Sequence, residues 1–260
     1  MSRRHLTTGQ GSIDAVLEVV VTSAPDRDPG SSRNVRTIFT EIAPHYDLLN
    51  HLLSANVDRR WRRLAVNALG EFAVGSRKVL DACAGTFDMS LELVGRPGFS
   101  GRVMAVDFAF PMLASGRPKL DGRAVLPVCG DCLRLPFPDG SFDAAMVAFG
   151  IRNLTDVGAG FREYRRVLRP AGRLAILEFT TPPNRVVRAG YLFYFHRILP
   201  LIGRLVSGHP CAYSYLPASV KAFPGPGGIA RQLEEAGFAN VGWSYLTGGI
   251  AALHLADRPE

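Results

Sequence analysis

This sequence contains few cysteines, and it shows neither an apolar leader nor a long apolar run. Its 260 residues include only four cysteines, too few for the disulfide framework of a small extracellular scaffold. No apolar run reaches the roughly 18 residues that a membrane-spanning helix needs. The first residues, Met1 to Gln10, are polar and lack the apolar centre of a secretory signal. We therefore expect a cytoplasmic chain whose cysteines stay reduced.

The sequence also lacks the patterns that would give its cations and cysteines a special role. The net charge of +7 is spread along the chain, with one cluster of arginines around Trp61 and without the aromatic platform typical of RNA readers. We therefore expect no nucleic-acid partner. Cys129 and Cys132 form a C-x-x-C pair, but a zinc site needs further ligands, and only Cys211 with His209 forms another cluster. For this reason we expect no metal.

The chain divides into a short extension and one long domain. Residues 1–32 combine an apolar stretch with proline, glycine and serine, which predicts a loosely ordered N-terminal extension. Residues 33–260 are expected to form a single domain, since 47% of the chain is apolar and can supply a sizeable core. Within it, residues 33–70 carry apolar positions at helical spacing, which predicts N-terminal helices.

From residue 78 onward, short apolar runs alternate with amphipathic segments. They predict strands at 78–82, 102–107, 125–129, 142–149 and 173–179, and helices at 89–94, 111–116 and 159–168. Near-continuous apolar strands between helices indicate a parallel sheet covered on both faces. Two further strands, 241–246 and 250–255, join through Thr247-Gly248-Gly249 as a closing hairpin. The predicted fold class is therefore α/β, with a doubly wound, mostly parallel, seven-stranded Rossmann-like sheet and a C-terminal antiparallel hairpin.

Acidic and small residues lie where three of these strands end. The first strand leads through Asp81 into small residues around Gly85, where a nucleoside can approach the backbone. Asp107 ends the second strand, and its carboxylate can bind both hydroxyls of a ribose or, alternatively, cap the helix that follows. Asp131 follows the third strand, where an acid beside a backbone N–H can bind an adenine edge. The three strand ends together predict one ligand crevice at the carboxyl edge of the sheet.

Three longer motifs carry a family resemblance. They are F-T-E-I-A-P-H-Y-D-L-L-N at 39–50, F-G-I-R-N-L-T-D at 149–156 and L-T-G-G-I-A-A-L-H at 246–254. In this order they resemble the ubiquinone/menaquinone biosynthesis C-methyltransferase family, a group of class I S-adenosylmethionine-dependent methyltransferases, over residues 35–256. The resemblance implies a methyltransferase domain that uses S-adenosylmethionine and leaves S-adenosylhomocysteine.

The resemblance also implies roles for residues at matching positions. The cofactor-binding set comprises Asp81 on the first strand, Gly85 and Thr86 at the methionine part, Asp107 at the ribose, and Asp131 with Cys132 at the adenine. The catalytic set comprises Arg152 and Asn153 at the quinone head group, and Tyr46 and Asp47, which help to close the site. The sequence departs from the family pattern at Phe87, usually glycine, and at Ala148, usually serine. Because Gly85 is intact, we expect Phe87 to point away from the cofactor into the helix packing.

The reaction implied by the resemblance is methylation of a ring carbon in a prenylated hydroquinone. Demethylmenaquinol is the preferred substrate, and a ubiquinone precursor is the alternative. Arg152 is expected to stabilise the phenolate or to polarise a water that takes its proton, because the guanidinium stays charged. The alternative for Arg152 is a surface ion pair with Asp156. His196 and His254 are secondary candidates for a base, since a lone histidine is more often structural.

Two functions of other classes stay open at this point. Phe87 and Ala148 are compatible with a methyltransferase-like subunit that has lost its activity and serves a quinone-synthesis complex. A nicotinamide-dependent dehydrogenase would explain Asp107, but it would not explain the motif at 149–156.

The segment 185–224 is predicted to be an insertion that covers the substrate. Its residues 191–206 are rich in aromatic and aliphatic side chains with spaced cations, a composition typical of a buried lid helix or of a lipid-facing lid. A polyprenyl tail favours the lipid-facing form, because each exposed methylene costs about 0.8 kcal/mol. We therefore expect transient contact with the inner face of the membrane, helped by the basic charge. Members of the family often associate, so the resemblance leaves a homo-oligomer open, although the sequence indicates no interface.

Overall fold

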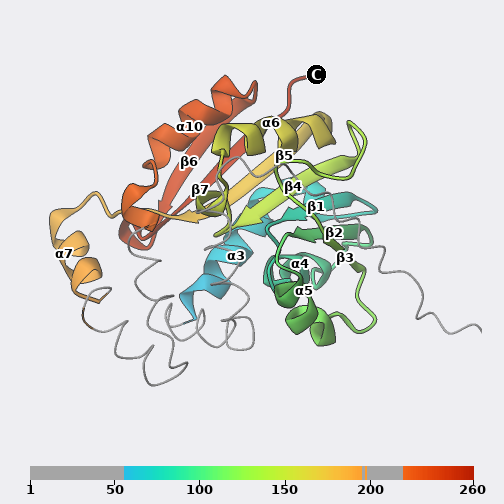
Figure 1. Cartoon of the computed structure of the whole chain (residues 1–260), viewed down its shortest axis with the longest axis horizontal. Helices are drawn as coiled ribbons and strands as arrows, with labels where there is room; N and C mark the ends of the chain where they lie inside the picture. The colour runs from blue at the N-terminus through green and yellow to red at the C-terminus, as the bar shows by residue number, and fades with distance from the viewer. Residues whose placement is uncertain (1–55, 195–196, 198–218) are drawn as a thin grey trace, which may run out of the picture.

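A mixed sheet forms the centre of the molecule (Figure 1). The computed structural model describes residues 56–194, 197 and 219–260. Within them, the strands are β1 (Lys78–Ala82), β2 (Arg102–Asp107), β3 (Val125–Cys129), β4 (Phe142–Ala148), β5 (Leu168–Phe179), β6 (Ala239–Leu246) and β7 (Ala251–Asp257). The seven strands lie in the order β3-β2-β1-β4-β5-β7-β6, and β7 runs antiparallel to both of its neighbours. This arrangement confirms the predicted sheet and its C-terminal hairpin.

Helices cover both faces of the sheet. They are α3 (Val57–Ala68), α4 (Asp88–Val94), α5 (Phe110–Gly116), α6 (Val157–Val167), α7 (Arg185–Phe193) and α10 (Pro226–Glu235), with short turns of 3-10 helix at η2 (Gly70–Ala73), η3 (Arg117–Leu120), η4 (Ile151–Asn153) and η6 (Thr247–Gly249). α6 and α10 lie on one face, and α3, α4 and α5 lie on the other (Figure 1). The sheet is therefore wound on both sides, as the apolar strands predicted.

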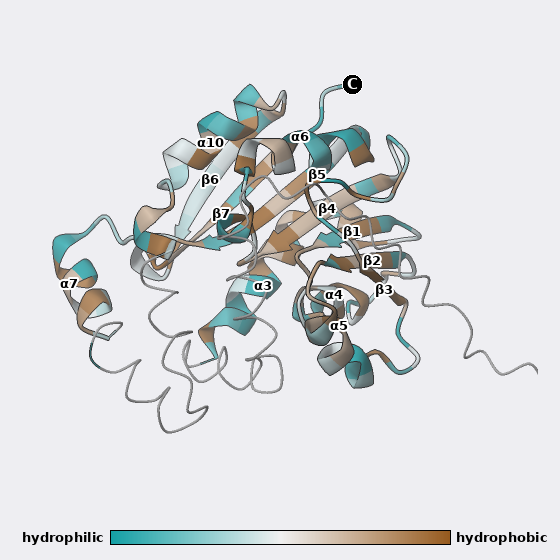
Figure 2. Ribbon diagram, viewed as in Figure 1, coloured by the Kyte–Doolittle hydropathy of each residue, from teal (hydrophilic) through white to brown (hydrophobic). Residues whose placement is uncertain are grey.

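Each central strand contributes to two separate hydrophobic cores. Val79 and its neighbour Leu80 are both fully buried, but Val79 packs in the core beneath α3 and α4, and Leu80 packs in the core beneath α6 and α10. Successive side chains of a strand point to opposite faces, so both must be apolar when both faces are covered. Figure 2 shows this as apolar colour along the central strands and polar colour on the outer faces of α6 and α10.

Several element boundaries differ from the sequence-based prediction, among them those of β4, β5 and α6. β4 ends at Ala148, because Phe149 takes a left-handed backbone conformation with φ 59°. β5 begins at Leu168, five residues before the expected start at Arg173. α6 begins at Val157, where Asp156 caps the helix by accepting a hydrogen bond from the N–H of Ala159 at 2.8 Å.

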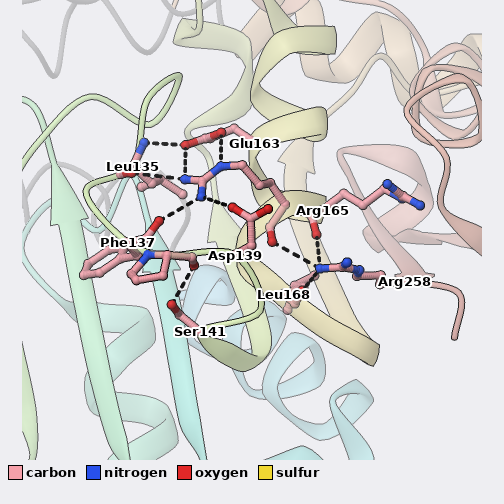
Figure 3. Close-up of polar contacts among 10 residues, drawn as sticks. Leu135, Phe137, Asp139, Ser141, Glu163, Arg165, Leu168 and Arg258 are labelled. Carbon is pink, nitrogen blue, oxygen red and sulfur yellow. Dashed lines mark hydrogen bonds and ion pairs between the residues drawn. The ribbon is translucent and has the colours of Figure 1, made fainter.

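Polar contacts fasten the loop between β3 and β4 to α6, and Figure 3 labels Asp139 of the loop and Glu163 of the helix. The Arg166 guanidinium lies 2.7 Å from a Glu163 carboxylate oxygen and 2.6 Å from an Asp139 oxygen. It also donates to the backbone carbonyls of Phe137 at 2.8 Å and Leu135 at 3.2 Å. This network holds the segment that follows Asp131, where the sequence predicted adenine binding.

Several predicted segments fall partly or wholly outside the described residues. α3 lies within the predicted helical range 33–70, and α7 lies within the predicted lid 185–224; most of the remainder of both ranges, and all of residues 1–32, are outside. The division of the chain into these ranges stays a prediction. None of the helices that the structure describes has the length and hydropathy required to cross a membrane.

Candidate active site

The end of β1 leads into a tight turn that contacts a neighbouring loop. Cys83, Gly85 and Phe87 have positive φ angles of 55°, 54° and 72°, so the chain reverses sharply before α4. A Cβ added at Gly150, just after β4, would lie 2.3 Å from the Cβ of Cys83. Only glycine fits at that position, and its absence of a side chain lets the loops after β1 and β4 touch.

Asp107 joins the turns that follow β1 and β2. Its Oδ2 accepts a hydrogen bond from the N–H of Gly85 at 2.9 Å, and its Oδ1 accepts one from the N–H of Ala109 at 2.8 Å. Burial raises the pKa of Asp107 to about 6, while the two N–H donors act in the opposite direction. A carboxylate has further lone pairs, so this geometry is compatible with ribose hydroxyls as additional donors.

Asp81 is buried at the end of β1 with a neutral partner. Its side chain is covered, with the residue only 1% exposed, and its Oδ2 accepts a hydrogen bond from Ser90 Oγ at 2.6 Å. Burial raises the pKa of Asp81 to about 7, and the Ser90 hydrogen bonds and the Arg62 cation oppose that rise. The carboxyl is therefore expensive to ionise in the folded chain unless a ligand contributes a donor.

A pocket opens between the end of β1 and helices α3 and α4. Its lining consists of Arg62, Asp81, Cys83, Ala84, Gly85, Thr86, Asp88, Met89 and Ala148. Phe87 does not belong to this lining: its ring is fully buried, and a Cβ added at Gly116 of α5 would lie 2.7 Å from it. The expectation that Phe87 points away into the helix packing is confirmed, and the turn keeps its small residues toward the pocket.

The C-x-x-C sulfurs have different neighbours. Cys132 Sγ lies 3.7 Å from Cys83 Sγ in the core beneath α6, whereas Cys129 Sγ lies 3.8 Å from the carbonyl oxygen of Phe108. Asp131 accepts a hydrogen bond from the N–H of Leu133 at 2.8 Å. Cys132 is only 3% exposed and packs in this core, so its side chain does not line the pocket. Among the described residues, no cluster of three or more potential ligands could hold a metal ion.

Arg152 forms a buried ion pair at the ends of β4 and β5. Its Nη1 lies 2.7 Å from Glu178 Oε1, and the two side chains are 7% and 3% exposed. The same nitrogen donates to the carbonyl of Phe149, and the Arg152 N–H donates to Glu178 Oε2 at 3.3 Å. The alternative of a surface pair with Asp156 is therefore wrong, because Asp156 caps α6 instead. Asn153 follows in the same η4 turn and is half-buried.

Stacked aromatic rings connect Arg152 to the pocket. The rings of Phe149 and Phe179 stack with centroids 4.4 Å apart. The Arg62 guanidinium of the pocket lies 5.4 Å from the Phe149 centroid, and the Arg152 guanidinium lies 5.6 Å from the Phe179 centroid. Both cations are thus placed over one aromatic pair, where ring quadrupoles attract them. The expected cofactor site and the expected head-group site are adjacent.

The comparisons with known proteins agree with this geometry. The model of the ubiE/COQ5 methyltransferase family matches residues 28–258. The chain belongs to this family. It is 48% identical over 225 residues to a demethylmenaquinone methyltransferase of Thermus thermophilus, covering 85% of this chain and all of that relative. It is 44% identical over 235 residues to an enzyme of the same name from a Mycobacterium species, covering 90% and 96% of the two chains.

Solved structures share the fold of this ubiE/COQ5 methyltransferase at low sequence identity. A SAM-dependent methyltransferase from Thermotoga maritima superposes with a TM-score of 0.60 at 16% identity, covering 85% of this chain and 98% of that one. One from Aquifex aeolicus gives a TM-score of 0.54 at 20% identity, covering 74% and 88%. The predicted methyltransferase class and its S-adenosylmethionine cofactor are confirmed, and the dehydrogenase alternative is not supported.

Two residues of this ubiE/COQ5 methyltransferase were missed by the sequence analysis. Glu178 is the partner of Arg152, and its only signal was an acid at the end of an apolar strand. Tyr191 comes from α7 and lies 8% exposed beside that ion pair. Burial raises the pKa of Tyr191, the Arg152 cation lowers it, and the Glu178 carboxylate adds to the rise. α7 therefore brings a neutral phenol to the Arg152–Glu178 pair.

The remaining predicted residues lie elsewhere. Tyr46, Asp47 and His196 are outside the described residues. His254 is buried on β7, where its Nε2 lies 3.0 Å from the carbonyl oxygen of Pro226. Burial lowers the pKa of His254, so its ring is neutral at pH 7 and packs beneath α10.

Proposed function

We propose that the chain methylates a ring carbon of demethylmenaquinol with S-adenosylmethionine as the donor. The Thermus thermophilus and Mycobacterium relatives, at 48% and 44% identity, both have the name demethylmenaquinone methyltransferase, which favours this acceptor over a ubiquinone precursor. In the structure, the proposal rests on the buried arginine Arg152, which Glu178 fixes beside the cofactor pocket.

The lining of the pocket combines small and polar side chains, which supports binding of the methyl donor. The small side chains of Ala84 and Gly85 line it, and Asp107 braces the same turn from outside with a hydrogen bond to the N–H of Gly85. Two buried polar atoms of the lining, Arg62 Nε and Asp88 Oδ2, have no hydrogen-bond partner among the described residues. When bound, S-adenosylmethionine supplies a methyl group on a sulfonium, which is a strong electrophile.

Arg152 supplies the positive charge that can stabilise the phenolate of the acceptor ring. A ring carbon becomes nucleophilic when the neighbouring phenol loses its proton, and C-methylation releases one proton overall. The Arg152 guanidinium stays protonated, so it can stabilise the phenolate without itself exchanging a proton. Glu178 holds Nη1, whereas Arg152 Nε is buried without a hydrogen-bond partner among the described residues. Glu178 thus fixes the Nη1 nitrogen of the guanidinium, and the Nε–H remains as a donor for the phenolate.

The first experiment follows a labelled methyl group. Purified protein, labelled S-adenosylmethionine and reduced demethylmenaquinone in detergent are expected to give lipid-extractable label. A control reaction contains a ubiquinone precursor instead. Label only in the ubiquinone precursor would identify that precursor as the acceptor instead of demethylmenaquinol. Label in neither quinone, with S-adenosylhomocysteine binding intact by calorimetry, would exclude both as acceptors.

Replacement of Arg152 tests its catalytic role. Arg152→Ala is expected to lower kcat by about 100-fold or more, the loss typical of one electrostatic donor, with little change in the dissociation constant of S-adenosylhomocysteine. Arg162→Ala serves as the matched control, because the Arg162 side chain is 63% exposed on α6. Equal losses of turnover and cofactor affinity in Arg152→Ala would show that the residue only supports the fold.

We also propose that α7 faces the membrane during catalysis. α7 projects from the body of the domain in Figure 1. Its Val186 and Phe193 are 81% and 61% exposed, an unusual state for apolar residues of a helix, and Arg185 is exposed beside them. Exposed apolar and cationic groups on one helix favour an anionic lipid surface. Such contact would bring the prenyl tail near Tyr191 of the same helix.

Vesicle sedimentation tests this surface. Val186→Asp with Phe193→Ser is expected to weaken sedimentation with phosphatidylglycerol vesicles but not with phosphatidylcholine vesicles. Neutral substitutions at Arg197 and Arg204, two of the spaced cations of residues 191–206, are expected to do the same. Leu126→Asp is the control, because Leu126 is 46% exposed on β3. Unchanged sedimentation of the α7 variants would show that α7 does not contact the membrane.

A homo-oligomer stays a prediction that native mass measurement can test.

A further inference from the structure

One arginine of the cluster around Trp61 differs from the others. Arg59, Arg60 and Arg63 are exposed, as expected for cations of a surface helix, but Arg62 is buried with its residue 6% exposed. The guanidinium of Arg62 lines the cofactor pocket. A buried cation is costly unless it is paired and hydrogen-bonded, so the partners of Arg62 decide what it does.

The protein itself satisfies Arg62 poorly. Its Nη2 lies 3.6 Å from Asp58 Oδ2 and 3.6 Å from Asp88 Oδ2, beyond hydrogen-bond length, and its Nε has no hydrogen-bond partner among the described residues. Asp88 Oδ2 likewise has no hydrogen-bond partner there, whereas Asp88 Oδ1 lies 2.8 Å from Lys119 Nζ. One donor and one acceptor of opposite charge are therefore left side by side in the pocket lining.

We propose that Arg62 and Asp88 bind the zwitterionic amino-acid end of the methyl donor, Arg62 its carboxylate and Asp88 its ammonium. This inference rests on the proposed methyl donor and assigns residues that the sequence did not indicate. A guanidinium matches a carboxylate with parallel N–H donors, and a carboxylate oxygen is the complementary acceptor for an ammonium. A zwitterion also adds no net charge, so it completes both partners without unbalancing the buried site.

The neighbouring groups are consistent with this assignment. The Asp81 carboxyl already accepts from Ser90, at 2.6 Å, and Asp107 already accepts from two backbone N–H groups. Phe149 lies under the Arg62 guanidinium at 5.4 Å and shields one of its faces. Arg62 is thus the cation that this pocket lining offers to a carboxylate, because it is the one basic residue of the lining.

A truncated ligand separates binding of the amino acid from support of the fold. S-adenosylhomocysteine has the zwitterion, and 5′-methylthioadenosine lacks it while keeping the nucleoside and sulfur. Calorimetry with both ligands is performed on the wild type, on Arg62→Met, and on Arg63→Met as the exposed control from the same helix. Arg62→Met is expected to weaken S-adenosylhomocysteine by about 10- to 100-fold, the loss of a charge-assisted hydrogen bond, and to leave 5′-methylthioadenosine unchanged.

The other outcomes have distinct meanings. Equal weakening of both ligands, or no weakening, would overturn the role of Arg62. Wild-type protein that binds neither ligand would instead overturn the proposed methyl donor. If Arg62→Met does not fold, the affinities of wild-type protein for S-adenosylmethionine and for decarboxylated S-adenosylmethionine are compared instead. Loss of the carboxylate alone is expected to weaken binding by a similar factor. Equal affinity for the two ligands would contradict the inference.

Discussion

The proposed cofactor half and the proposed acceptor half of the site hold their buried charges in different ways. At the ends of β1 and β2, Asp81 and Asp107 accept hydrogen bonds from a hydroxyl and from backbone N–H groups, and burial raises both pKa values. At the ends of β4 and β5, Arg152 and Glu178 neutralise each other at 2.7 Å. The carboxylates of the cofactor half thus lack a compensating charge of comparable closeness until a ligand binds.

The two groups of buried charges therefore differ in their stability before a ligand binds. An ion pair is stable in the empty site, so it keeps Arg152 in one orientation before the acceptor arrives. Carboxyls with only neutral donors are destabilising when ionised, and a ligand that supplies donors relieves that cost. The proposed cofactor half is therefore less stable without its ligand, whereas the proposed acceptor half is already arranged before its ligand binds.

The largest expected effect comes from breaking the ion pair. Glu178→Ala leaves the Arg152 cation buried and unpaired, and is expected to lower the free energy of unfolding by about 3 to 5 kcal/mol. Chemical denaturation measures the loss. The double variant Arg152→Met with Glu178→Leu is the control, and it is expected to recover most of the stability because no charge stays buried. A similar loss in both variants would mean that packing, rather than charge, is responsible.

A smaller effect of opposite sign is expected at Asp81. Its folded pKa of about 7 lies above the ordinary aspartate value of 3.8, so its contribution to stability is full below pH 3.8 and is lost as the pH rises through 7. Asp81→Asn mimics the neutral carboxyl, and is expected to raise the free energy of unfolding by roughly 1 to 3 kcal/mol at pH 8 and to change little at pH 4. A pH-independent difference would contradict this cause.

The third expected effect concerns cofactor affinity. Asp107, with its pKa raised to about 6, accepts hydrogen bonds fully only when ionised. Calorimetry with S-adenosylhomocysteine is expected to give a constant affinity above pH 7 and an affinity about tenfold lower at pH 5, one unit below that pKa. A constant affinity from pH 5 to 8 would show that ionisation of Asp107 does not affect ligand binding.

The smallest effect is expected outside the crevice, where an ion pair is exposed. The Asp139 side chain, labelled in Figure 3, is 76% exposed, although its Oδ1 lies 2.6 Å from Arg166 Nη1. Asp139→Asn is expected to change the free energy of unfolding by no more than about 0.5 kcal/mol, because water already solvates both charges. A loss close to that of Glu178→Ala would show that burial does not explain the strength of the Arg152–Glu178 pair.

The sequence predicted the strand ends well and their partners poorly. Asp81, Gly85 and Thr86 line one pocket, and Asp107 fastens its turn, as their places after two apolar strands indicated. Glu178 was missed, because its pairing with Arg152 spans 26 residues and depends on β5 lying beside β4. Arg62 was seen only as one of four arginines, since helical spacing did not show which one faces inward.

The sequence by itself determined the alternation of strands and helices, the closing hairpin and the family, because these depend on local periodicity, turn residues and motif order. The tertiary structure alone decided the partner of Arg152, and it supplied the physical reason for the direction of Phe87 that the sequence had predicted from the intact Gly85. Phe87 turns away from the pocket because Gly116, 29 residues later in the sequence, leaves room for its ring. Contacts of this kind depend on packing between distant segments, and no local pattern of residues specifies them.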